Sequence, residues 1–130
     1  MQRKSNSGCA CGGMTNLLLP CSGAADTGEI ADRAARRFAG RGCAGMFCLA
    51  GVGANISGFI ASARGADRLL VVDGCKLDCG LKALQEKGIS ENIIHLRLTD
   101  LGLVKGQSPA NEENVELVVA ELGRKLNQSL

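Results

Sequence analysis

A short apolar run followed by a stretch with helical periodicity occurs four times along this chain, and no other feature constrains the fold as strongly. The predicted strands are residues 15–20, 46–50, 68–73 and 92–98, and the predicted helices are residues 25–40, 54–64, 77–87 and 112–126. Continuous apolar strands that alternate with helices are typical of a parallel sheet covered on both faces. We therefore predict an α/β fold with three layers, Rossmann-like or flavodoxin-like, in which about four strands are parallel.

The length of the chain fits one domain. A chain of 130 residues buries roughly two-thirds of its unfolded surface, which is enough for a core without covalent cross-links. Residues 1–14 are polar, rich in Gly and Ser and without periodicity, and we expect them to be a flexible arm that carries the pair Cys9 and Cys11. Residues 15–130 are predicted to form a single domain.

Composition excludes several kinds of partner. A net charge of +2, three Phe and no Trp or Tyr provide neither the field nor the aromatic rings that nucleic-acid binding needs. The longest apolar run near the N-terminus is Leu17–Leu19, too short for a membrane span or a secretion signal. We therefore expect a cytoplasmic protein with no membrane or nucleic-acid partner. The sequence leaves a homo-oligomer and the identity of any protein partner open.

Four of the seven cysteines lie near or after the ends of three predicted strands. Cys21 comes after the first, Cys48 lies near the end of the second, Cys75 comes after the third, and Cys79 opens the next helix. In a parallel sheet these positions meet at the carboxyl edge, where ligands bind. Four thiolates can bind Zn²⁺ in a closed, structural site, and three thiolates with a water molecule would make an open, catalytic site. An iron–sulfur cluster is the alternative, because four cysteines bind it as well. Cys43 is interpreted as a core residue.

An enzyme that uses thiol, redox or metal-assisted chemistry is a second hypothesis, and the sequence does not decide whether the protein is an enzyme. Cys21 would be the reactive thiol at a helix N-terminus, with Asp26 or Asp73 as a nearby carboxylate. A base is lacking, because the only histidine, His95, is expected to be a partly exposed strand residue. No catalytic residue can be assigned.

A small-anion site is a third hypothesis. Residues 23–30 have the glycine spacing of a phosphate-binding loop, but Glu29 replaces the lysine that would contact phosphate. Residues 51–56 lack the third glycine of a dinucleotide fingerprint. We interpret both as tight turns, whose backbone at Ser22, Gly23 and Gly53 offers amide groups to a small anion.

Three short motifs carry a family resemblance. They are residues 20–26 (PCSGAAD), residues 48–54 (CLAGVGA), and residues 73–75 (DGC) with a cysteine at 79. Together they resemble the DGC-domain family, small prokaryotic proteins described as zinc-binding, over about residues 9–98. The resemblance implies four metal-chelating cysteines, which correspond to Cys21, Cys48, Cys75 and Cys79. It implies no reaction, because the family has no assigned biochemical function.

Overall fold

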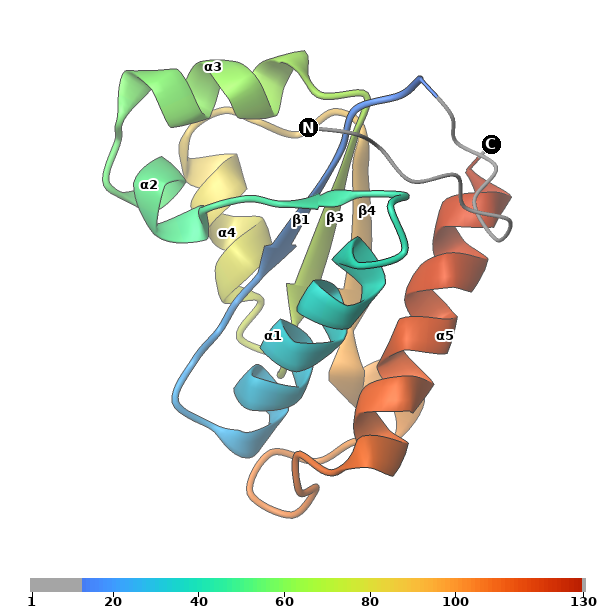
Figure 1. Cartoon of the computed structure of the whole chain (residues 1–130). Coiled ribbons are helices and arrows are strands. Elements are labelled where there is room, and N and C mark those ends of the chain that lie inside the picture. The colour runs from blue at the N-terminus through green and yellow to red at the C-terminus, as the bar shows by residue number, and fades with distance from the viewer. Residues whose placement is uncertain (1–12, 130) are drawn as a thin grey trace.

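The computed structural model describes residues 13–129, and the predicted Cys9 and Cys11 pair lies outside them. Four parallel strands form one sheet in the order β2-β1-β3-β4 (Figure 1). The strands are β1 (Asn16–Pro20), β2 (Gly45–Met46), β3 (Arg68–Asp73) and β4 (Ile93–Arg97). This confirms the predicted parallel α/β fold.

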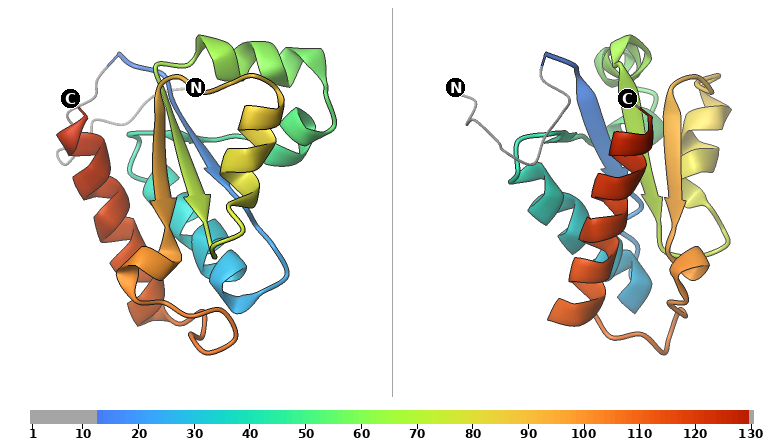
Figure 2. Two further views of the ribbon diagram at one scale, coloured as in Figure 1. Left: turned by 180° about the vertical axis from the view of Figure 1, so that it is seen from behind. Right: turned by 90° about the vertical axis from the view of Figure 1, so that its right-hand side faces the viewer.

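Helices cover both faces of the sheet and complete three layers (Figure 2). They are α1 (Asp26–Ala39), α2 (Leu49–Gly53), α3 (Ser57–Gly65), α4 (Cys79–Glu86) and α5 (Glu112–Gln128), with a 3₁₀ turn, η1 (Leu98–Leu101), after β4. Helices α1 and α5 lie on one face, and α2, α3 and α4 on the other. Within residues 13–129, no helix is long and apolar enough to cross a membrane.

Neighbouring residues of each strand point to opposite faces and so build two separate cores. On β1, Leu18 packs into the core beneath α1 and α5, whereas Leu19 packs into the core beneath α2, α3 and α4. On β3, Leu70 and Val71 divide in the same way, and all four side chains have no exposed surface. Burial on both faces explains why these strands are continuously apolar in sequence.

The second βα unit differs most from its prediction. Strand β2 ends at Met46, and Cys48 is already the N-cap of α2, so residues 49 and 50 are helical and not extended. The helix predicted over residues 54–64 begins only at Ser57, because Asn55 adopts a left-handed conformation (φ 65°) that separates α2 from α3.

We predict that Leu70→Ala lowers the free energy of unfolding by about 2–5 kcal/mol, because it removes a fully buried side chain from the middle of the sheet. Urea unfolding followed by far-ultraviolet circular dichroism measures the change. Leu117→Ala is the matched control, since Leu117 is 42% exposed on α5, and it should cost less than about 1 kcal/mol. Equal losses in the two variants would contradict the placement of the core.

Candidate functional site

The strand order places a topological switch point between β1 and β3. From β1 the chain passes to β2 on one side, and it then crosses over to β3 and β4 on the other side. In open α/β sheets, ligands bind outside the carboxyl ends of the strands at such a point. The carboxyl ends of β2, β1 and β3 are adjacent, and a cysteine follows each of them within two residues. Cys48 follows β2, Cys21 follows β1, and Cys75 follows β3.

Two of the edge sulfurs are held by backbone amides. The Sγ atom of Cys21 accepts a hydrogen bond from the N–H of Gly74 at 3.3 Å, which joins the end of β1 to the loop after β3. The Sγ atom of Cys48 accepts one from the N–H of Gly51 at 3.3 Å, which caps α2. These bonds orient the sulfurs in the way that second-sphere donors orient metal ligands.

The loop after β3 packs closely against the first turn of α1, and this turn packs closely against the loop after β1. Gly74 and Gly28 permit these two contacts because neither has a side chain. A Cβ atom on Gly74 would lie 2.8 Å from the carbonyl carbon of Thr27, in the first turn of α1. A Cβ atom on Gly28 would lie 2.8 Å from the backbone nitrogen of Gly23. Real Cβ atoms do not approach this closely, so both positions require glycine. The close backbone packing brings the residue after Gly74, Cys75, towards the Cys21 loop.

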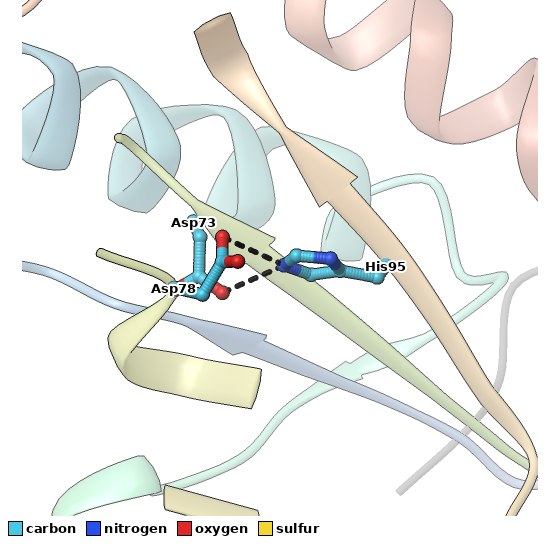
Figure 3. A group of neighbouring side chains, drawn as sticks. All are labelled: Asp73, Asp78 and His95. Carbon is cyan, nitrogen blue, oxygen red and sulfur yellow. Dashed lines mark hydrogen bonds and ion pairs between the residues drawn. The ribbon is translucent and has the colours of Figure 1, made fainter. Parts of the chain in front are cut away.

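A buried carboxylate organises the other side of the edge. Asp73, 1% exposed at the end of β3, accepts hydrogen bonds from the N–H groups of Gly80 at 2.7 Å and Leu81 at 3.2 Å, in the first turn of α4. Its second oxygen also lies 2.8 Å from Nε2 of His95 on β4 (Figure 3). Asp73 therefore links β3, α4 and β4, and it orients the imidazole of His95.

A second carboxylate, Asp78, contacts the same histidine and an arginine. Its Oδ1 lies 3.7 Å from Nε2 of His95, and its two oxygens accept hydrogen bonds from Arg97, at 2.8 Å from Nε and 2.5 Å from Nη2. The hydrogen bonds from the Arg97 guanidinium hold the pKa of the Asp78 carboxyl below its usual value, and the Asp78 carboxylate raises the pKa of Arg97. This bidentate pair fixes Asp78, which precedes Cys79 and has a left-handed φ of 54°.

Among residues 13–129, the carboxylate and imidazole atoms of Asp73, Asp78 and His95 form a group within 4.8 Å of one another. Such atoms can ligate a metal, but here the oxygens of both carboxylates already accept bonds from α4 or from Arg97. We interpret the group as a hydrogen-bonded network that positions α4. In the same part of the chain, the four edge sulfurs do not form a group this compact, and their assignment as metal ligands stays a prediction.

The structure also places the remaining predicted residues. Cys21 is half-buried and lies four residues before the N-cap of α1, so the expectation that it sits at a helix N-terminus is wrong. Cys79 is exposed and is the first residue of α4, as predicted. Cys43 is 7% exposed within the core beneath α1 and α5. Gly53 ends α2 and is not in a turn that opens a helix.

A carboxylate, Asp26, lies at the start of α1, next to the loop that is predicted to bind a small anion. Ser22 and Gly23 are exposed, and Ser22 has a left-handed φ of 53°. The Oδ1 atom of Asp26, in the first turn of α1, accepts the N–H of Thr27 at 2.7 Å and that of Gly106 at 2.9 Å. The hydrogen bond from Gly106 lowers the pKa of Asp26, which favours the charged form of this carboxyl group. Binding of a small anion by Ser22, Gly23 and Gly53 stays a prediction.

Sequence reasoning missed the network around His95. The signal for this network was the alternation in β4, where the polar residues His95 and Arg97 alternate with the apolar residues Ile94, Leu96 and Leu98. Residues two apart on a strand share a face. The register then sets Asp73 opposite Arg97, and His95 opposite Val71. The polar alternation could have indicated one polar face on β4, but not which carboxylates it meets.

The fold and the site define a small parallel α/β protein whose carboxyl edge bears free cysteines. The chain belongs to the DGC domain family, whose model matches residues 17–122. It is similar to the anaerobic and virulence modulator AnvM of Pseudomonas aeruginosa, with 32% identity over 111 residues, which are 85% of this chain and 84% of that protein. No solved structure matches the chain.

We predict that Gly74→Ala lowers the free energy of unfolding by about 1–3 kcal/mol, because its methyl group would clash with the backbone of α1. Urea unfolding measures this effect. Gly58→Ala, on α3, is the control, because a Cβ atom at Gly58 would have no neighbouring atom within 4 Å. This variant should leave the free energy of unfolding unchanged or raise it by up to about 1 kcal/mol. If Gly74→Ala were as stable as Gly58→Ala, the close packing of the two loops would be refuted.

Proposed function

We propose that this protein binds Zn²⁺ at the carboxyl edge of its sheet, through Cys21, Cys48, Cys75 and Cys79. One observation carries the proposal: four free thiols lie along one edge of the sheet, after the ends of three adjacent strands and at the start of α4, next to the switch point. The hydrogen bond between the Cys21 sulfur and Gly74 supports it, because it places that sulfur beside the loop that carries Cys75.

The chemistry of these donors fits the metal. Four cysteine sulfurs are a common structural ligand set for Zn²⁺, with Zn–S distances of about 2.3 Å, and the same set also suits an iron–sulfur cluster. When bound, zinc would cross-link the three loops. Neither Ser22 nor Gly23 is buried, and a Cβ atom on Gly23 would meet nothing within 4 Å, so the Cys21 loop has space in which to adjust.

We assign the bound metal a regulatory role and not a catalytic one. The related AnvM is named a modulator. Within residues 13–129, the hydrogen bond and the ion pairs of His95 are with carboxylates and not with a cysteine, so this histidine is not placed as a base for a reactive thiol. A thiol or redox enzyme that uses Cys21 is the alternative, and the metal content of the protein distinguishes the two.

We predict about one zinc per chain in anaerobically purified protein, measured by elemental analysis. The single variants Cys21→Ser, Cys75→Ser and Cys79→Ser should lose most of the metal, because each removes one sulfur ligand. His95→Gln is the matched control, since it alters the neighbouring polar network and leaves every cysteine, and it should keep the metal.

Three results would overturn this assignment. Metal-free protein from zinc-replete cells would refute zinc binding. If His95→Gln lost its zinc and the three cysteine variants kept theirs, the ion would bind at His95, Asp73 and Asp78 and not at the cysteines. Visible absorption with stoichiometric iron would identify a cluster in place of zinc.

We also predict that chelation loosens the edge without unfolding the sheet. Strands β1 and β3 are buried between two apolar cores, so we expect the metal to organise the loops at the edge and not to hold the sheet together. Hydrogen–deuterium exchange of chelated protein should accelerate in residues 21–28 and 73–80, while residues 68–72 stay protected. Equal acceleration in both regions would show instead that the fold depends on the metal.

A further inference from the structure

A pocket of about 480 Å³ lies beside the cysteine edge. One wall is the loop between β3 and α4, which contributes Cys75 and Leu77. The opposite wall is the segment that follows η1, which contributes Leu103 and Val104. The volume is within the range of about 300–1,000 Å³ that small-molecule sites occupy. None of the functions considered above uses this pocket.

Its lining is apolar and open to solvent. Leu77 is 57% exposed and Val104 is 46% exposed, and they are two of the four large hydrophobic side chains that are exposed in residues 13–129. A single exposed leucine needs no explanation, but two that face one pocket form an apolar surface suited to a ligand. Leu103, which is 6% exposed, continues this surface inward.

Two cations flank the apolar lining. Lys76 precedes Leu77, Lys105 follows Val104, and both lysines are exposed and line the pocket. Within the described part of the chain, neither lysine forms an ion pair, whereas six other basic side chains do. These six are Arg33, Arg36, Arg37, His95, Arg97 and Arg124. The lysines therefore offer uncompensated positive charge beside an apolar cavity.

We infer that this pocket binds a small amphiphilic anion, a carboxylate with an unbranched chain of about eight to ten carbons. The alkyl chain would cover Leu77, Leu103 and Val104, and the carboxylate would lie near Lys76 and Lys105. Burial of the chain provides the affinity, and the two ammonium groups favour an anion over a neutral or cationic molecule of the same length.

The form of the surface favours a small ligand over a protein partner. A stable protein interface buries about 800 Å² on each side, whereas the apolar surface here is confined to three side chains around one concavity. Its apolar walls contain no proposed metal ligand other than Cys75, so the inference does not rest on zinc binding.

The test is a titration with decanoate, followed in two-dimensional ¹H–¹³C spectra of protein labelled at its Leu and Val methyl groups. The protein is used as purified, with its zinc content measured in parallel, so that the failure of one proposal does not affect the other. The methyl signals of Leu77, Leu103 and Val104 should shift and saturate together. The Leu117 signal should not move, because this exposed leucine lies on α5, outside the pocket.

Chain length and charge provide separate readouts. Each methylene added between hexanoate and decanoate should tighten binding by up to about fourfold. Decanol should bind more weakly than decanoate, and decyltrimethylammonium more weakly still. The double variant Lys76→Gln/Lys105→Gln should weaken decanoate binding about three- to tenfold and leave decanol unchanged. Lys87→Gln, at the other end of α4, is the control and should change neither.

The double variant Leu77→Ala/Val104→Ala should weaken decanoate binding about tenfold or more. Both side chains are exposed, so this variant should fold normally, which far-ultraviolet circular dichroism checks. The inference is overturned if decanoate shifts no pocket methyl, if Leu117 shifts as much as Leu77, or if decyltrimethylammonium binds as tightly as decanoate.

Discussion

The arrangement of the carboxyl edge of the sheet depends on the hydrogen bonds of one buried carboxylate, that of Asp73. It accepts two N–H groups from the first turn of α4 and contacts His95 of β4, so one side chain joins three elements. A carboxylate with 1% exposure is tolerated because its oxygens are hydrogen-bonded. Gly80 makes this possible, since a Cβ atom there would lie 2.9 Å from Oδ1 of Asp73.

The motif Asp73-Gly74-Cys75 therefore has a physical explanation for each of its positions. The aspartate holds α4 and β4. The glycine permits contact with the backbone of α1 and donates its N–H to the sulfur of Cys21. The cysteine is half-buried and lines the pocket beside the edge. Three consecutive residues thus connect the sheet, both helical layers and the candidate ligand surfaces.

The sequence was sufficient for elements that depend on local or repeated patterns. Strand β3 was predicted over its observed residues, 68–73, because it is apolar on both faces. The division between α2 and α3 was not predicted, since it depends on the left-handed conformation of Asn55. The contact of His95 with Asp73 joins residues 22 positions apart and requires the register of β3 and β4, which periodicity does not provide.

The same contacts determine which cysteines can move. The loop that carries Cys75 lies between two fixed points, Asp73 in the sheet and Gly80 in the first turn of α4. Asp78, held by Arg97 from β4, restrains this loop further, directly before Cys79. The hydrogen bond that the structure gives to the Cys48 sulfur, from the N–H of Gly51, lies within its own helix cap and does not reach the Cys75 loop. A metal that gathers all four sulfurs would therefore draw the Cys48 and Cys21 loops towards the Cys75 loop, because the Cys75 loop is the most restrained of the three.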